Sequence, residues 1–291
     1  EIILKALHSH EIPENIDFTI VGSIQCLQKT HKKLRSLGLK NIANPDNLQI
    51  YDHESSCSDK TFKSSHGHSS FKYLTKAVEI VKKYPNSALV TGPICKKSWS
   101  LAGHDFSGQT EVLAKSCGAK NVGMLFTAKS PITGWRFNTL LATTHIALCD
   151  VPKKLNTELI HSKLDLFRDF CNTYIARPTF KVAGLNPHAG EEGILGKEEK
   201  DWLNNALISW NKKNKDIKLL GPLSPDSCWN SSAKAWREKD AEKHDGILAM
   251  YHDQGLIPMK IIALNYSVNT TIGLPFIRTS PDHGTGFDIA G

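Results

Sequence analysis

The chain has 291 residues, of which 40% are hydrophobic and 22% are charged, as is ordinary for a soluble globular protein. This length predicts one large domain or two domains of medium size. The formal net charge is +7, but its lysines are dispersed and lack the stacking aromatic residues of single-strand binders. We therefore expect an anionic small molecule, and not nucleic acid, as the partner.

The sequence also bears on membranes and on redox state. No apolar run is long enough to cross a bilayer, so no membrane partner is expected. The seven cysteines are widely spaced without any Cys-x-x-Cys pair. This pattern indicates reduced thiols and a cytoplasmic location, not a disulfide framework or sulfur-bound zinc. The chain begins at Glu1 without an initiator methionine, so we expect further residues before it.

Apolar runs alternate with amphipathic segments along the chain. Strands are predicted at residues 17–22, 87–93, 121–126, 139–143, 181–184, 217–220 and 246–250. Helices are predicted at residues 24–37, 71–83, 111–117, 156–174, 198–211 and 236–243, and a long exposed loop at residues 55–70. Continuous apolar strands separated by helices are typical of a mostly parallel sheet covered on both faces. The sequence therefore predicts an α/β fold.

Three histidines, His145, His188 and His252, each lie in a loop that follows a predicted strand. Ligands of α/β sheets bind outside the carboxyl ends of strands, so these imidazoles could converge. One such histidine alone is more often structural, but converging neutral imidazoles form a divalent-metal site with positions open to substrate. We predict a metal site here. Three carboxylates could orient the ligands or join them: Glu191, Asp226 and Asp253.

A second group of side chains could bind an anion. Lys260 and Arg278 flank an apolar stretch, and with the amide of Asn269 they could clamp a carboxylate and a phosphate. Gln109 and Thr110 open a predicted helix, where free N–H groups bind anions, although an ordinary helix cap explains them equally well. Gly-x-Gly-x-x-Gly after a strand and Gly-x-x-x-x-Gly-Lys-Ser/Thr are both absent from the sequence. A nucleotide cofactor must therefore be held in another way.

Several long segments of the chain form characteristic motifs, among them Gly184-Leu185-Asn186-Pro187-His188 and Tyr251-His252-Asp253-Gln254-Gly255. The segments are residues 91–96, 103–104, 108–111, 143–145, 184–196, 198–199, 221–226, 251–255 and 273–291. Taken together, they resemble the 4-hydroxythreonine-4-phosphate dehydrogenase family, NAD-dependent enzymes of vitamin B6 biosynthesis. Similarity before residue 91 is weak. Motifs of this length in this order are highly specific.

The resemblance implies a reaction and a set of cofactors. NAD or NADP would oxidise 4-phosphohydroxy-L-threonine to 2-amino-3-oxo-4-phosphooxybutanoate, which loses carbon dioxide to give 3-amino-2-oxopropyl phosphate for pyridoxal 5'-phosphate biosynthesis. A divalent cation (zinc, magnesium, manganese or cobalt) would lie on His145, His188 and His252, in a site shared across a homodimer. The positions implied for substrate are Gln109, Thr110, Lys260, Asn269 and Arg278. The positions implied for the cofactor are His283, Gly284, Thr285 and Asp288.

The family's fold is implied as well: two α/β/α lobes around a cleft, as in the isocitrate and isopropylmalate dehydrogenases. The first lobe would comprise residues 1–108 and 270–291, and the second residues 109–269. Asp226, Asp253 and Lys260 remain alternative candidates for the catalytic base. Gln109 stands where the family usually has histidine, and because it cannot carry charge, phosphate affinity could differ.

Three other functions remain open at this point. A sister dehydrogenase acting on a phosphorylated threonate or a similar hydroxy acid would have much the same motifs. A phosphate acyltransferase of similar two-lobed architecture would need no histidine triad. A non-catalytic metal-binding protein would leave the anion-binding groups beside the histidines without a purpose.

Overall fold

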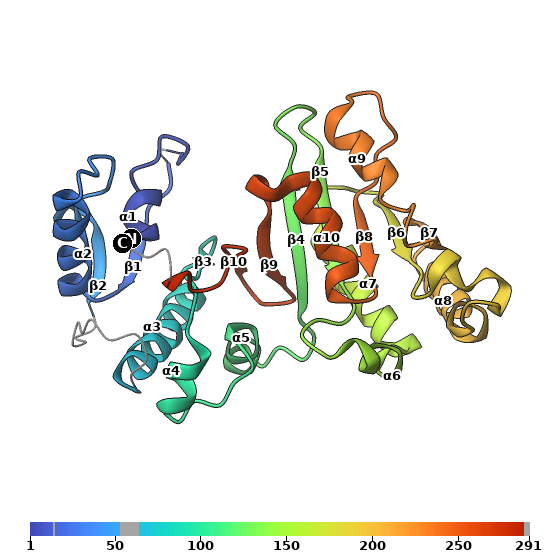
Figure 1. Cartoon of the computed structure of the whole chain (residues 1–291), viewed down its shortest axis with the longest axis horizontal. Helices are drawn as coiled ribbons and strands as arrows, with labels where there is room; N and C mark the ends of the chain where they lie inside the picture. Colours follow the sequence, from blue (N-terminus) through green and yellow to red (C-terminus); the bar gives the residue numbers. More distant parts are fainter. Residues whose placement is uncertain (14, 53–63, 288–291) are drawn as a thin grey trace. The chain divides into compact units, whose positions relative to one another are not determined.

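The computed structural model of the protein describes residues 1–13, 15–52 and 64–287 (Figure 1). The chain divides into two compact units. The first unit is Glu1–Gly118 together with the residues from His283 onward, and the second is Ala119–Asp282. Among the described residues, no helix has both the length and the apolar character needed to cross a membrane.

The first unit contains helices around short strands. Its elements are α1 (Ile2–Ala6), β1 (Thr19–Gly22), α2 (Ile24–Ser36), η1 (Pro45–Asn47), β2 (Gln49–Asp52), α3 (Ser64–Lys83), β3 (Ala88–Val90), α4 (Lys96–Leu101) and α5 (Gln109–Cys117). Strands β1 and β2 pair in parallel. The Ser23 side chain caps α2 by accepting a hydrogen bond from the Cys26 N–H, so the helix begins where the sequence predicts it.

Helix α3 begins earlier than predicted. Residues 64–70 are helical, so the predicted loop is wrong for this part, and its remainder at residues 55–63 lies outside the described residues. The reason is packing against α4, which a local reading of polar residues cannot show. At Gly67 an added Cβ would collide with the Ser98 carbonyl oxygen, and the Trp99 indole N–H donates to the Ser70 hydroxyl at 2.8 Å.

The second unit is built on seven strands of one sheet. They are β4 (Gly123–Lys129), β5 (Arg136–Leu141), β6 (Thr179–Ala183), β7 (Lys218–Leu223), β8 (Gly246–Ala249), β9 (Val268–Ile272) and β10 (Ile277–Ser280), in the spatial order β10-β9-β4-β5-β8-β6-β7. Strand β5 pairs with β8, β8 pairs with β6, and β6 pairs with β7, all in parallel. The pairings among β5, β4, β9 and β10 are antiparallel.

The α/β class is confirmed, with parallel pairing on one side of this sheet only. Connections at residues 130–135 and 273–276 are too short to carry a crossover helix, so β4–β5 and β9–β10 fold back as antiparallel neighbours. Strands β9 and β10 were not predicted, because alternating Thr, Asn and Arg in this stretch mask their apolar pattern.

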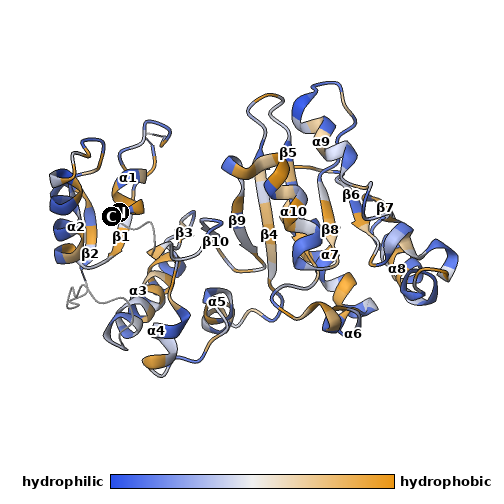
Figure 2. Ribbon diagram, in the orientation of Figure 1, coloured by the Kyte–Doolittle hydropathy of each residue, from blue (hydrophilic) through white to orange (hydrophobic). Residues whose placement is uncertain are grey.

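Helices of the second unit follow its strands in most cases. They are η2 (Leu148–Asp150), α6 (Val151–Lys154), α7 (Thr157–Cys171), η3 (Pro187–Gly193), η4 (Glu199–Leu203), α8 (Asn204–Lys213), α9 (Asn230–Arg237), α10 (His252–Ala263) and η5 (Leu264–Tyr266). Figure 2 shows predominantly apolar colouring in β8 and predominantly polar colouring in α2, as expected for a buried strand and a surface helix.

Two predictions in this unit are wrong. The helix predicted at residues 236–243 lies earlier, because α9 ends at Arg237 and the charged segment after it has almost nothing apolar to bury. His252 and Asp253 do not lie in a loop but form the first turn of α10.

The division between the units differs from the lobe limits at residues 108 and 269 drawn from the sequence. Helix α5 contacts α3 and so belongs to the first unit. Strand β9 pairs with β4, and β10 pairs with β9, which keeps residues up to Asp282 in the second unit.

Candidate functional site

The carboxyl ends of β5 and β8 bring His145 and His252 together. The two strands are parallel neighbours, so the residues that follow them leave the sheet at the same edge. The Thr143 hydroxyl donates to the Met250 carbonyl at 2.7 Å, which ties the two following segments to each other. The His145 and His252 ring centroids lie 5.5 Å apart. Two imidazoles at this separation can share one cation, since zinc–nitrogen bonds are about 2.0–2.1 Å long.

Asp253 orients one of these rings. Its Oδ1 lies 2.8 Å from His252 Nδ1, and a proton on Nδ1 leaves the Nε2 lone pair available to a metal ion. A surface cavity of about 270 Å³ opens at the pair. Its lining residues come from the segments after β5 and β8: Thr144, His145, Ile146, Leu148, Val151, Tyr251, His252 and Asp253.

Helix α10 is fixed against the sheet at its first turn. Gln254 is 8% exposed; its Oε1 accepts the Met250 N–H at 2.6 Å and its Nε2 donates to the Gly184 carbonyl at 2.7 Å. A Cβ at Gly255 would lie 2.5 Å from Leu141 Cδ2, so only glycine allows this close approach. Gln254 therefore links the end of β8 to the end of β6, where the His188 segment begins.

His188 lies in a turn of unusual backbone conformation. Five consecutive residues, 188–192, have positive φ, and four of them are not glycine. The left-handed region costs a non-glycine residue about 1–2 kcal/mol, and such strain is concentrated at functional sites.

The Ser224 hydroxyl donates to Asp226 Oδ1 at 2.5 Å and lowers the pKa of that carboxyl, and His188 lowers the pKa of Asp226 further. The structure thus brings His188 near Asp226.

The three histidines do not form one cluster within a single chain. In residues 1–13, 15–52 and 64–287, no group of three His, Cys, Asp or Glu side chains is placed to hold a metal ion. His145 and His252 could hold a divalent ion as a pair, with Asp253 on the second ring, only if further ligands come from outside this pair.

Asn269 and Arg278 lie on neighbouring strands with their side chains on one face. Asn269 pairs with Ser280 and Thr271 pairs with Arg278 across β9 and β10. Arg278 is 4% exposed, and its Nη1 donates to the Thr271 hydroxyl at 2.9 Å. Burial lowers the pKa of Arg278 to about 10, so the guanidinium remains charged at neutral pH. A buried positive charge beside an amide suits an anionic ligand.

Lys260 lies on α10, two helical turns after His252. Its Nζ is 3.5 Å from Asp282 Oδ2, and both side chains are partly exposed. The ion pair places Lys260 beside Asp282, which is the last residue of the second unit.

The other residues predicted for substrate and cofactor belong to the first unit. Gln109 is buried and its Nε2 donates to the Gly92 carbonyl at 2.8 Å, while Thr110 is the second residue of α5. His283 Nδ1 lies 2.8 Å from the Gly284 carbonyl oxygen, and both residues, with Thr285, are exposed. Asp288 lies outside the described residues.

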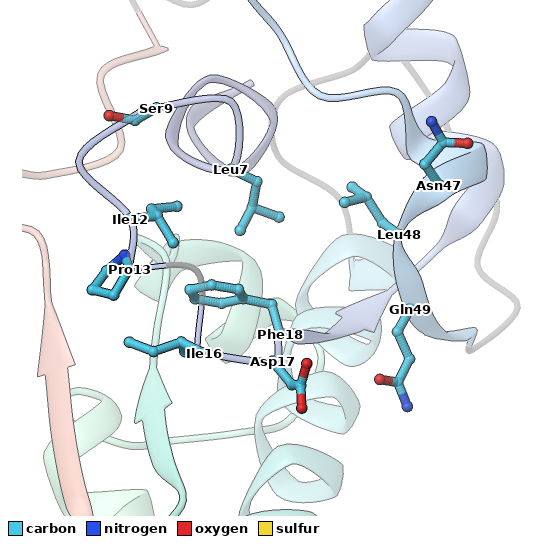
Figure 3. A pocket seen from close by; sticks show the side chains of 10 residues that line it. All are labelled: Leu7, Ser9, Ile12, Pro13, Ile16, Asp17, Phe18, Asn47, Leu48 and Gln49. Atoms are coloured by element: carbon cyan, nitrogen blue, oxygen red, sulfur yellow. The ribbon is translucent and has the colours of Figure 1, made fainter.

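A second cavity, of about 430 Å³, lies in the first unit (Figure 3). Both apolar and polar residues line it: Leu7, Ser9, Ile12, Pro13, Ile16, Asp17, Phe18, Asn47, Leu48 and Gln49. None of the residues predicted for metal, substrate or cofactor is among them.

Sequence reasoning assigned no role to Gln254 or Glu199, although both lie in or beside the matching motifs. Both are buried polar residues that bond the backbone next to a predicted ligand. The available signal was the spacing of glycines in residues 184–196 followed by two glutamates, which indicates a tight turn that needs an acceptor.

The fold and the site together define an α/β enzyme in which His145 and His252 lie together at the carboxyl ends of two parallel strands. The chain belongs to the pyridoxal phosphate biosynthetic protein PdxA family, which it matches over residues 14–291. The family resemblance drawn from the motifs is thereby confirmed.

Relatives and solved structures agree with this assignment. The chain is 47% identical over 295 residues to a 4-hydroxythreonine-4-phosphate dehydrogenase of Synechococcus sp. (strain RCC307), covering 100% of this chain and 89% of the relative. It is 44% identical over 303 residues to that of Synechocystis sp. (strain ATCC 27184 / PCC 6803 / Kazusa), covering 100% and 86%. The crystal structure of 4-hydroxythreonine-4-phosphate dehydrogenase from Klebsiella pneumoniae superposes with a TM-score of 0.76 at 29% identity, covering 94% of this chain and 82% of that one.

Proposed function

We propose that this chain oxidises 4-phosphohydroxy-L-threonine with NAD or NADP in pyridoxal 5'-phosphate biosynthesis. The names of its relatives support the dehydrogenase activity. The observation that carries the proposal is the His145–His252 pair beside Asp253, in a cavity at the carboxyl edge of the parallel strands. The buried Arg278 supplies positive charge for an anionic substrate.

His145, His188 and His252 would hold a divalent cation, zinc, magnesium, manganese or cobalt. Such an ion, when bound, lowers the pKa of an alcohol and polarises a carbonyl oxygen. Asp253 keeps the His252 ring in the tautomer that a ligand needs. Oδ1 of Asp253 already faces His252 Nδ1, so Asp226 and Lys260 are the better candidates for the base.

Anionic groups of the substrate would be bound by Lys260, Asn269 and Arg278, with Gln109 and Thr110 at the start of α5. Held in this way, the reacting C–H bond can be aimed at the nicotinamide, and positioning of this kind lowers reaction barriers by several kcal/mol. A cofactor would contact the exposed loop of His283, Gly284 and Thr285, together with Asp288.

We further propose a homodimer whose subunits share the site. Ile257, Ile261 and Leu264 are 58%, 78% and 67% exposed and lie four and three residues apart, on one side of α10 and η5. A row of exposed apolar residues at helical spacing is typical of an interface. The row lies along the helix that begins at His252. The exposed Ile194 directly follows η3, the segment that contains His188.

The location proposed for the enzyme is the cytoplasm. The cysteines among the described residues, Cys26, Cys95, Cys117, Cys149, Cys171 and Cys228, are all free, which supports a reducing compartment.

The test is a steady-state assay of NADH formation with 4-phosphohydroxy-L-threonine and a series of divalent ions. A phosphorylated threonate serves as the competing substrate. We expect His252→Ala to lower kcat by at least about 10²-fold because a metal ligand is lost, whereas Thr110→Ala should act mainly on KM. Normal turnover by His252→Ala in the presence of a chelator would contradict the metal proposal. A higher kcat/KM for the phosphorylated threonate would instead assign that hydroxy acid as the substrate.

A further inference from the structure

Glu199 is a buried carboxylate that no step of the proposed reaction uses. It is 3% exposed and is the first residue of η4, a short π-helical segment. Burying an ionised carboxylate is unfavourable unless hydrogen bonds compensate it. Its Oε1 accepts the N–H groups of Leu185 at 2.7 Å and Asn186 at 2.9 Å, and its Oε2 accepts the Asn186 side-chain amide at 2.9 Å.

The left-handed turn of residues 188–192 folds around this carboxylate. A Cβ at Gly190 would lie 2.8 Å from Glu199 Oε2, and a Cβ at Gly184 would lie 3.1 Å from Oε1. At Gly196 an added Cβ would collide with the side chain of Asn186. The backbone therefore approaches Glu199 and its partner from both ends of the turn, at positions where only glycine fits without a shift.

Four of the five residues of this turn are not glycine. Four non-glycine residues, among them His188, adopt a region that is unfavourable for them. Their strain must be offset by contacts outside the turn, and the bonds to Glu199 lie immediately before it. Bonds from N–H groups to an ionised carboxylate are roughly twice as strong as neutral ones.

We propose that Glu199 is a positioning residue that holds the 188–192 turn in its left-handed conformation and thereby presents His188 to the metal. The proposal rests on the proposed function, in which His188 is a ligand. A glutamine in this place would turn one acceptor oxygen into a donor, facing either the Asn186 amide or the two backbone N–H groups.

Glu198 provides a matched control on the same chain. It accepts a hydrogen bond from Asn186 Nδ2 at 2.7 Å but makes no bond to the backbone of residues 185 and 186, and it is more exposed than Glu199. A glutamine at 198 can still accept this bond through its carbonyl oxygen. Glu198→Gln and Glu199→Gln thus make the same chemical change at adjacent positions.

The experiment compares Glu199→Gln, Glu198→Gln and His188→Ala in the full chain. Amide hydrogen exchange is measured over residues 185–193, and Mn²⁺ affinity is measured by titration. We expect Glu199→Gln to accelerate exchange across this segment and to weaken Mn²⁺ binding by about 10–100-fold, whereas Glu198→Gln changes both by less than about twofold. Asn186→Ala, which keeps both backbone bonds, provides a milder variant if Glu199→Gln does not fold; it should shift both measurements in the same direction.

The outcomes separate this inference from the proposed function. Unchanged exchange in Glu199→Gln, or in Asn186→Ala if only that variant folds, would overturn the inference. If His188→Ala weakens Mn²⁺ binding and Glu199→Gln does not, the inference falls while the ligand role of His188 stands. If exchange accelerates in Glu199→Gln but His188→Ala binds Mn²⁺ normally, the presentation of His188 to a metal falls together with its proposed role.

Discussion

Single residues of the second unit have protonation states that only their surroundings explain. His244 is an example away from the candidate site. Its Nε2 lies 2.9 Å from the Ser232 hydroxyl, and its ring packs edge-on against Trp135 with the centroids 5.2 Å apart. Burial, followed by the nearby Lys181, lowers the pKa of His244 to about 3. The ring is therefore neutral in the folded protein near neutral pH.

This lowered pKa predicts an acid-sensitive stability. The unfolded chain takes up a proton on His244 as the pH falls through about 6.5, while the folded chain does not until about 3. The stability that the neutral His244 gives to the folded protein is thus fully present above pH 6.5 and is lost as the pH falls. We expect protonation of His244 in the unfolded chain to lower the free energy of unfolding by about 1.5 kcal/mol between pH 6.5 and pH 5.

Urea unfolding at several pH values between 5 and 6.5 tests this prediction. His244→Phe should flatten the dependence on pH in this range, even though it lowers stability at pH 7 by leaving Ser232 without its partner. The exposed His8, replaced by glutamine, is the control and should leave the dependence unchanged. A dependence equally steep in His244→Phe and in the parent would show that other groups cause it.

At the scale of elements, α10 determines where His252 and Lys260 lie. The helix contacts β4, β5 and β8, and Gly255 permits its closest approach to the sheet. The sequence predicts a loop at His252, directly after a strand, and Gly255 and Pro258 are poor helix residues. Tertiary packing overrides this local preference, since Leu256, Met259 and Ala263 are buried against the sheet side.

Gly255→Ala is expected to displace this helix. The new methyl group would meet Leu141, Ala249 and Thr139 within 3.0 Å, so the free energy of unfolding should fall by about 1–3 kcal/mol. His252 should move with the helix, and Mn²⁺ affinity should fall as well. Chemical denaturation and metal titration measure the two effects.

Gly92→Ala is the matched control for this substitution. An added Cβ at Gly92 meets nothing within 4 Å, so stability should change by less than about 1 kcal/mol. If Gly255→Ala is as stable as Gly92→Ala and binds Mn²⁺ like the parent, close packing at Gly255 does not position His252.

At the scale of the whole molecule, the shared site can be tested by mixing inactive variants. His145→Ala, His188→Ala and His252→Ala proteins would be mixed in pairs, after unfolding and refolding together, and assayed for NADH formation. In a heterodimer, two ligands that belong to different subunits of one site leave one of the two sites intact. At least one pairing should therefore regain up to about a quarter of the parent activity.

The pairings provide their own controls. Two ligands that one subunit contributes to the same site, as the adjacent His145 and His252 would, cannot complement each other. Recovery in no pairing, although the mixtures form dimers by light scattering, would contradict a site shared between subunits. Ile261→Glu should abolish both dimer formation and activity, because it places a charge in the exposed apolar row of α10.

Local patterns in the sequence were sufficient for the α/β class, most strands and helices, and the family. Apolar runs such as residues 121–126 and 181–184 report burial directly, and the motifs around His188 and His252 are contiguous in the chain. Only the tertiary structure decided the antiparallel half of the sheet, the helical start at His252, and the bonds of Gln254 and Glu199 to distant backbone. The physical reason is that strand pairing and buried hydrogen bonds join residues remote in sequence, whose partners no local pattern specifies.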